Sequence, residues 1–368
     1  MPPAAPPRRA TTGHSTTGHP TTGRPQPSAT AVGIWLWLVA LLVLVMVGVG
    51  GATRLTGSGL SITEWRPIMG AIPPLSDADW ADAFAKYKQI PQYVEVNKGM
   101  RLAEFKSIFW WEWGHRLLGR LIGLVFTLPL AWFWWRGAIT PRLGRQLLGL
   151  LALGGLQGAM GWYMVMSGLT ERVTVSQYRL AAHLGLAIVI FGWLVWIALG
   201  LTPQHRRGIR LDTLNASQHR MAAWLPALVL VQILLGALVA GLKAGLTYNT
   251  WPLMDGKLVP DGLLMLSPWY ANPFENLTMV QFNHRVTAYV VLAATAWHAW
   301  VLQRIADGYV SGSAWALFAA VLGQAALGIW TLLAVVPLPL GIAHQTGAVI
   351  VFGMAVWHLH EVRSSSRA

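Results

Sequence analysis

Four histidines occupy corresponding places in the two halves of this sequence: His115 and His183 in the first half, His284 and His344 in the second. Each one lies near the start of a long apolar stretch. Two neutral imidazoles can bind a heme iron from its opposite faces when the flat ring lies between helices. We therefore expect each half to hold one heme between its two histidines.

Small residues surround these histidines and would allow a flat ring to approach the helices. They are Gly114, Gly119 and Gly123, Ala181, Ala182 and Gly185, and Ala343 and Gly347. Small residues also serve simple helix packing, and a single histidine in a membrane often makes only a hydrogen bond. Four histidines at one depth favour heme or another metal. Zinc is disfavoured because neither half offers a third ligand at a matching position. We interpret His298, His358 and His360 as interfacial or packing residues, because they lack counterparts in the first half.

Charged neighbours distinguish the two halves. Arg116 and Arg285 each follow a histidine directly, so either could pair with heme propionates. Glu112 lies three residues before His115 and on the same helix face, whereas Gln281 holds the matching place in the second half. A carboxylate at the membrane edge is costly and indicates a function as acid, base or cation stabiliser; a plain ion pair with Arg116 is the structural alternative. The asymmetry predicts a reactive site in the first half and a permanent cofactor in the second.

The composition indicates that these residues lie in a membrane. The chain has 368 residues, of which 54% are hydrophobic and only 11% are charged. About a quarter of the residues are charged in an ordinary soluble domain. The net charge of +13 lies mostly in arginine-rich loops, which fits membrane orientation better than nucleic-acid binding. The absence of cysteine excludes disulfides, cysteine-bound zinc and iron–sulfur clusters.

Hydropathy predicts an all-α integral membrane protein with eight transmembrane helices, since each needs about 20 apolar residues. The predicted spans are 31–51, 108–135, 146–168, 178–201, 221–242, 280–303, 313–336 and 340–360. The loops on one side are rich in arginine, and the long segments 52–107 and 243–279 lie on the other side. The positive-inside rule therefore places both termini in the cytoplasm.

Matched motifs indicate that the helices form two tandem four-helix bundles, related as a parallel repeat. Gln157-x3-Gly161 matches Gln324-x3-Gly328, and Ala-His at 182–183 matches Ala-His at 343–344. The predicted parts are a disordered cytoplasmic tail over 1–30, an N-terminal half over 31–203, a cytoplasmic linker over 204–220, a C-terminal half over 221–362 and a tail over 363–368.

From about residue 31 to 362 the sequence resembles the heme A synthase family of the CtaA type, and within it the cysteine-free subgroup. The matching motifs are Gly-Ala-Thr-Arg-Leu-Thr at 51–56, Ser-Gly-Leu-Ser at 58–61, Thr-Glu-Trp-Arg-Pro at 63–67, Glu112-x2-His115-Arg116, His183-x-Gly185, Asn-His-Arg at 283–285 and His344-Gln345-x-Gly347. The outer-loop motif is specific, whereas histidine pairs alone are not.

The resemblance implies an oxidoreductase that converts the C8 methyl of heme O to a formyl group by successive hydroxylations, giving heme A for cytochrome c oxidase. It implies that His115 and His183 hold heme O as substrate in the N-terminal half and that Glu112 is catalytic there. It implies that His284 and His344 hold a heme b cofactor in the C-terminal half.

The resemblance also implies partners and a location. Expected partners are heme O as substrate, a heme O synthase, an electron donor, membrane lipid and a second copy of the chain, and no nucleic acid. Seven prolines in the first thirty residues oppose the amphipathic helix of a mitochondrial transit peptide. We therefore expect the bacterial inner membrane.

Two other functions stay open at this point. A di-heme electron carrier of cytochrome b type would use both histidine pairs, but it would leave Glu112 and the outer-loop motif without a role. A transporter that uses the histidines as proton or ion sites would not require them to lie in pairs at one depth.

Overall fold

The computed structural model describes residues 29–66, 68–170, 173–201, 214–306 and 308–365. Within them, eight helices are long and apolar enough to cross a membrane, which confirms the predicted all-helical membrane protein. These helices are α1 (Ala29–Leu55), α3 (Leu102–Trp135), α4 (Pro141–Thr170), α5 (Gln177–Leu201), α6 (Ala216–Gly241), α8 (Leu277–Ile305), α9 (Gly308–Leu333) and α10 (Leu338–Ser365). Shorter helices are α2 (Asp77–Tyr87), α7 (Asn272–Glu275), η1 (Met69–Ala71), η2 (Gln92–Val96), η3 (Ala244–Leu246) and η4 (Trp269–Ala271).

Helix ends differ from the predicted spans where capping and turn geometry decide them. α3 begins six residues before the predicted start, because Glu104 Oε2 accepts the backbone N–H of Arg101 at 2.8 Å and caps a polar first turn. α6 begins inside the predicted linker, because Asn215 caps it. α9 ends three residues early, because Val335 and Val336 adopt left-handed φ values of 59° and 55°. Most of the predicted tails and linker lies outside the described residues.

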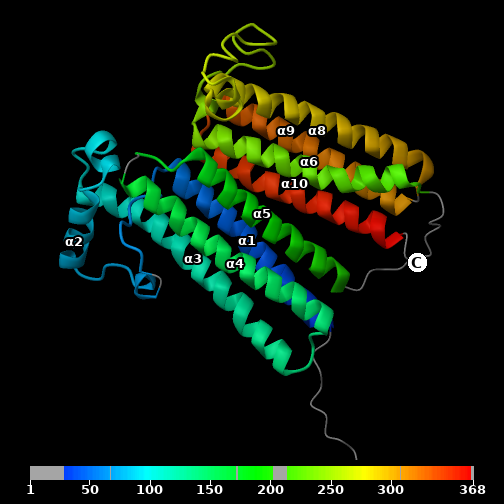
Figure 1. Ribbon diagram of the computed structural model, residues 1–368, viewed down its shortest axis with the longest axis horizontal. Helices are drawn as coiled ribbons and strands as arrows, with labels where there is room; N and C mark the ends of the chain where they lie inside the picture. The colour runs from blue at the N-terminus through cyan, green and yellow to red at the C-terminus, as the bar shows by residue number, and fades with distance from the viewer. Residues whose placement is uncertain (1–28, 67, 171–172, 202–213, 307, 366–368) are drawn as a thin grey trace, which may run out of the picture.

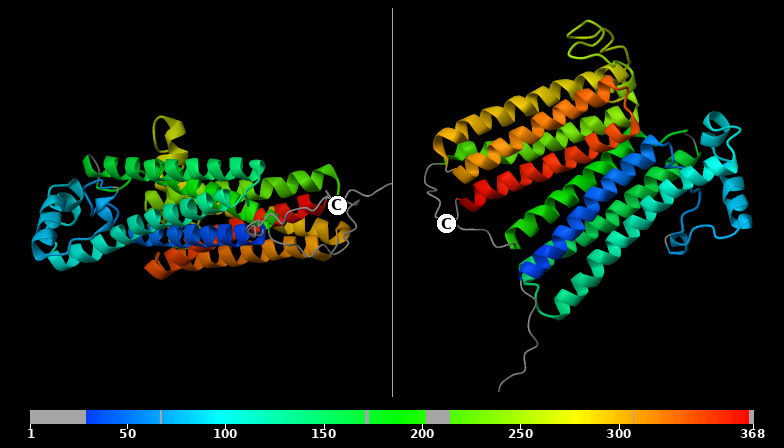
Figure 2. Two further views of the ribbon diagram at one scale, coloured as in Figure 1. Left: turned by 90° about the horizontal axis from the view of Figure 1, so that it is seen from below. Right: turned by 180° about the vertical axis from the view of Figure 1, so that it is seen from behind.

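The long helices form two groups that lie beside each other (Figure 1). One group holds α1, α3, α4 and α5, and the other holds α6, α8, α9 and α10. The two long segments, which carry α2 and the loop before α8, lie at one end of the helices, and the C-terminus lies at the other end (Figures 1 and 2). The first and last helices of each group, α1 and α5 with α6 and α10, make the contacts between the groups.

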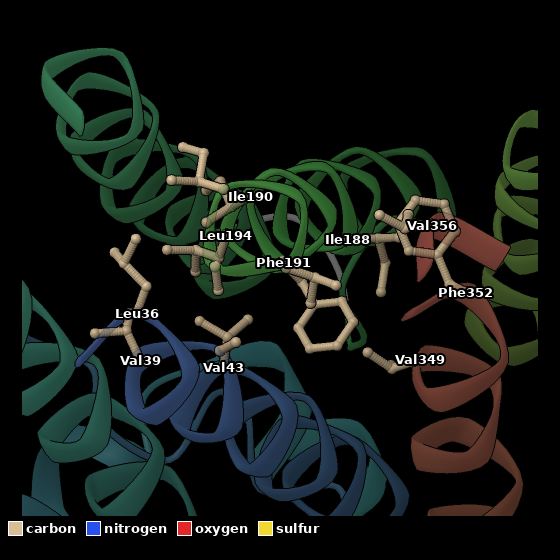
Figure 3. Packing of buried hydrophobic residues seen from close by; sticks show 14 of the residues in the cluster. Leu36, Val39, Val43, Ile188, Ile190, Phe191, Leu194, Val349, Phe352 and Val356 are labelled. Atoms are coloured by element: carbon tan, nitrogen blue, oxygen red, sulfur yellow. The ribbon is translucent and has the colours of Figure 1, made fainter. Parts of the chain in front are cut away.

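The contact between α5 and α10 is reciprocal. Figure 3 shows Phe191 of α5 and Phe352 of α10 within one apolar cluster, together with Leu36 and valines of α1. A Cβ added to Gly192 would lie 2.6 Å from the Phe352 ring, and one added to Gly353 would lie 3.1 Å from the Phe191 ring. Each phenylalanine therefore packs against the glycine that follows the other, so the two helices approach closely.

We expect Gly192→Ala to weaken the contact between the two groups by about 1–3 kcal/mol, the usual cost of overpacking a tight core. The added methyl meets the Phe352 ring and has no free space to enter. Thermal unfolding of the detergent-purified protein measures the effect. The matched control is Gly312→Ala on α9, where no atom lies within 4 Å of the added Cβ. Equal melting temperatures for the two variants would contradict the expectation.

The segment between α1 and α3 folds into a small aromatic core that the sequence reading did not anticipate. Ser76 caps α2, whose buried Trp80 and Phe84 pack on Phe109 and Phe105 of α3, with ring centres 4.9 and 5.0 Å apart. Burial also raises the pKa of the Tyr87 hydroxyl in this core. Leu60, from the 58–61 motif, belongs to the same cluster, so the core holds that motif against α3.

Candidate functional site

The structure places each of the four predicted histidines in the first half of its helix, towards the end with the long segments. His115 lies on α3, His183 on α5, His284 on α8 and His344 on α10. His284 and His344 face each other directly. Their ring centres are 6.5 Å apart, and their planes meet at 86°.

This distance fits the two axial ligands of one heme iron. A metal–imidazole bond is about 2 Å long, so two imidazoles on opposite faces of one metal have ring centres roughly 6 Å apart. The donor set is also suitable, since neutral imidazole is a common iron ligand. The spacing of the C-terminal pair is therefore close to that of two axial ligands on one heme iron.

Each histidine ring packs against a glycine of the preceding transmembrane helix. A Cβ added to this glycine would meet the ring at 3.1 Å for His115, 3.1 Å for His183, 3.1 Å for His284 and 2.6 Å for His344. The glycines, in the same order, are Gly50, Gly161, Gly236 and Gly328. Both pairs are thus built from the same local contact, which supports the predicted heme site in the N-terminal half as well.

Three of the rings also lie beside a glutamine amide. The amide nitrogen lies 3.2 Å from His183 Nδ1 for Gln157, 3.1 Å from His284 Nδ1 for Gln232 and 3.0 Å from His344 Nδ1 for Gln324. The amides of Gln157 and Gln232 lie 3.3 and 3.5 Å from Nε2 as well. Sequence reading found two of these glutamines as repeat markers but missed Gln232. The same spacing, glutamine four residues before glycine, occurs in Gln232-x3-Gly236 and could have revealed it.

Glu112 is buried, with 2% of its surface exposed, and three donors fix its carboxylate. Oε2 accepts hydrogen bonds from the Ser61 hydroxyl and the Ile62 backbone N–H, both at 2.8 Å. Oε1 accepts one from Arg116 at 2.6 Å, so the ion pair named above as the structural alternative does form. The donors on Oε2 are the last residue of the motif at 58–61 and the residue that follows it, so this motif holds the Glu112 carboxylate.

The second half has similar hydrogen bonds between its helix and the preceding loop, but an amide replaces the carboxylate. Gln281, at the place of Glu112, donates to the Tyr248 carbonyl at 2.9 Å. Arg285 donates to the carbonyls of Tyr248 and Thr250 at 2.8 and 2.9 Å. Arg116 likewise donates to two loop carbonyls, those of Ile62 and Glu64. Both arginines therefore anchor one of the two long segments to a helix, and their binding of heme propionates stays a prediction.

His298 and His358 form a second, buried pair farther along α8 and α10. Their Nε2 atoms are 3.0 Å apart, and the Ser313 hydroxyl lies 2.8 Å from His358 Nδ1. Both rings are almost fully buried, at 2% and 0% exposure. His360 is 8% exposed and packs edge-on against the Trp196 ring. These contacts agree with the interpretation as packing residues.

Comparisons with known proteins place the chain in a family. The model of the family COX15-CtaA, described as "Cytochrome oxidase assembly protein", matches residues 33–356. A "Heme A synthase" of Chelativorans sp. is 57% identical over 317 residues, which cover 86% of each chain. Proteins of the same name from Agrobacterium fabrum and Parvibaculum lavamentivorans are 56% and 54% identical; the matches cover 84% and 85% of this chain and 84% and 89% of theirs. The chain belongs to the COX15-CtaA family of cytochrome oxidase assembly proteins.

Proposed function

We propose that this chain oxidises the C8 methyl of heme O to a formyl group, by successive hydroxylations, and so supplies heme A to cytochrome c oxidase. Relatives named heme A synthase, 54–57% identical over most of the chain, support this activity. The observation that carries it within the structure is the unequal pair of sites. A buried carboxylate lies one helical turn before a candidate heme ligand in one half, and an amide takes its place in the other.

The N-terminal half, through His115 and His183, is the proposed site of the substrate heme O. The C-terminal half, through His284 and His344, is the proposed site of a resident heme b, and the distance between these two rings supports the assignment. When bound, heme b would supply one-electron transfer. The helices of each half would orient its two histidines and keep the two heme sites at similar depth in the membrane.

Glu112 is the proposed catalytic residue. Its carboxylate shares a helix face with His115, and the bonds from Ser61, Ile62 and Arg116 hold it in one position. A fixed carboxylate can take a proton from the reacting group or stabilise a cation that forms on it. The loss of water from a doubly hydroxylated carbon, which yields the aldehyde, requires a proton transfer of this kind.

We also propose the bacterial inner membrane as the location, with both termini in the cytoplasm. Arg136, Arg142, Arg145 and Arg304 lie in or next to loops at the end of the helices opposite the two long segments. Arginine-rich loops of this kind mark the cytoplasmic side. A heme O synthase, an electron donor and a second copy of the chain are the proposed partners.

Coexpression with a heme O synthase, followed by chromatography of the extracted hemes, tests the proposed function. We expect heme A to appear in membranes that contain both proteins and to be absent when this chain is omitted. The purified protein should contain heme b together with heme O or heme A. Two equivalents of heme b and no heme A would instead identify a di-heme electron carrier.

A further inference from the structure

The three glutamines beside the histidine rings make a second contact that limits how each ring can turn. The amide nitrogen that lies beside the ring also donates to the backbone carbonyl of the same histidine. The distances are 3.1 Å for Gln157 and His183, 3.0 Å for Gln232 and His284, and 2.6 Å for Gln324 and His344. One amide therefore contacts both the main chain and the side chain of its histidine, and a glycine one turn further along the same helix packs against the ring as well.

The same glutamine side chain can also serve a histidine that binds iron, through its amide oxygen. A ligand that uses Nε2 carries a proton on Nδ1, and metal-bound histidines almost always donate this N–H to an acceptor. The amide oxygens of Gln157 and Gln232 are buried without a hydrogen-bond partner. The atom beside Nδ1 is the amide nitrogen, which donates to the histidine carbonyl, so an Nδ1–H group could donate to the amide oxygen only after the amide turns over.

The fourth histidine lacks this contact. Gly50 faces His115 as Gly236 faces His284, and the residue four places before Gly50 is Met46, where the other three helices have glutamine. Its thioether has no N–H to donate and is at most a weak acceptor. The Met46 methyl instead lies 3.1 Å from the position that a Cβ on Gly119 would take, one turn beyond His115. Among the described residues, no side chain makes a hydrogen bond to the His115 ring.

The helix packing shows a related difference between the two halves. α9 packs along both α8 and α10, so the C-terminal group is closed around its histidines. α4 packs mainly on α5 and meets α3 only over a short stretch. The helix that carries His115 is thus less enclosed than its counterpart α8. Both differences fall in the half that we propose to hold the substrate.

We infer that Gln157, Gln232 and Gln324 are positioning residues that fix three of the four heme ligands, and that Met46 leaves His115 as the ligand through which the substrate heme exchanges. The inference rests on the proposed function, because a heme that is substrate and product must enter and leave. A heme b that stays in place gains from two fixed ligands. A heme that is released after each reaction needs one ligand that can turn away at low cost.

Exchanging the two residue types between the halves tests the inference. Met46→Gln supplies the missing amide with a side chain of similar length, and Gln232→Met removes one from the C-terminal site. Loss of such a contact typically weakens metal binding about 10-fold to 100-fold. We therefore expect Met46→Gln to slow heme loss from the N-terminal site about 10-fold, and Gln232→Met to speed loss of heme b by a similar factor.

Transfer of heme from the detergent-purified protein to excess apomyoglobin, followed by absorbance, gives both rates without reference to activity. Chromatography of the heme that remains shows which heme has left. The electron paramagnetic resonance signal of each low-spin heme reports the orientation of its two imidazoles, and Met46→Gln should change the N-terminal signal alone. Met46→Leu is the matched control, since it keeps the size and apolar character of methionine and adds no amide.

The inference fails if Met46→Gln and Met46→Leu lose the N-terminal heme at the same rate. If Gln232→Met does not fold, this comparison at Met46 decides alone. Failure of the proposed function looks different. Wild-type protein would then form no heme A on coexpression, while the two Met46 variants would still report whether an amide holds whichever heme fills the N-terminal site.

Discussion

Replacing Glu112 by glutamine should reduce heme A formation at least 100-fold while both hemes stay bound. The substitution keeps the shape of the side chain and its place beside Ser61, Ile62 and Arg116, but it removes the negative charge. General acid–base catalysis by a positioned group typically contributes about 10²-fold to 10⁴-fold to a rate. The loss should therefore appear in the chemical step and leave the histidine ligands in place.

The measurement is the amount of heme A formed per unit of purified protein after coexpression with a heme O synthase. Glu104→Gln is the control on the same helix, because Glu104 lies exposed at the start of α3 and a glutamine there can still cap the helix. Heme O should accumulate in the Glu112→Gln protein and be consumed by the control. Wild-type levels of heme A in the Glu112→Gln protein would refute the catalytic assignment and leave Glu112 as the structural partner of Arg116.

The second large effect concerns the C-terminal pair. His284→Ala should remove almost all heme b from the purified protein and, with it, most heme A formation. The variant leaves His344 as a single axial ligand, and an alanine cannot restore the bond that is lost. The N-terminal site is built on other helices, α3 and α5, so heme O should still be found there.

Heme content measured by extraction and chromatography separates the two sites in this experiment. His219→Ala is the control, since His219 lies on the first turn of α6, at the end of the bundle far from both pairs. Retention of heme b by the His284→Ala protein would contradict the assignment. Loss of both hemes together would indicate one coupled site in place of two.

Local residue patterns were enough to predict the helices and the candidate ligands. Apolar runs long enough for a membrane predicted eight spans, each of which overlaps a transmembrane helix of the structure. The repeated histidines, with Glu112 set against Gln281, indicated two unequal sites before any distance was known. These features are readable because each depends on residues that are close along one helix.

Other features could not be predicted because they depend on distant segments. Ser61 and Glu112 lie 51 positions apart in the sequence, and nothing in the segment between them indicated that the two share a hydrogen bond. The packing of Phe191 on Gly353 joins helices from opposite halves. α2 was missed because its apolar face is short and is completed by aromatic residues of α3. Burial against a partner, which periodicity in one segment cannot show, stabilises each of these contacts.

The sequence by itself determined that this chain is a helical membrane protein, and it predicted four histidine ligands and one carboxylate without a counterpart, since residue type and spacing along a helix carry that information. Only the tertiary structure decided that His284 and His344 lie 6.5 Å apart and that three donors hold Glu112. It also decided that glutamines lie beside three histidines and not beside His115. The reason is physical: a hydrogen bond or a metal site needs atoms within a few ångströms, and helix packing alone brings such residues together.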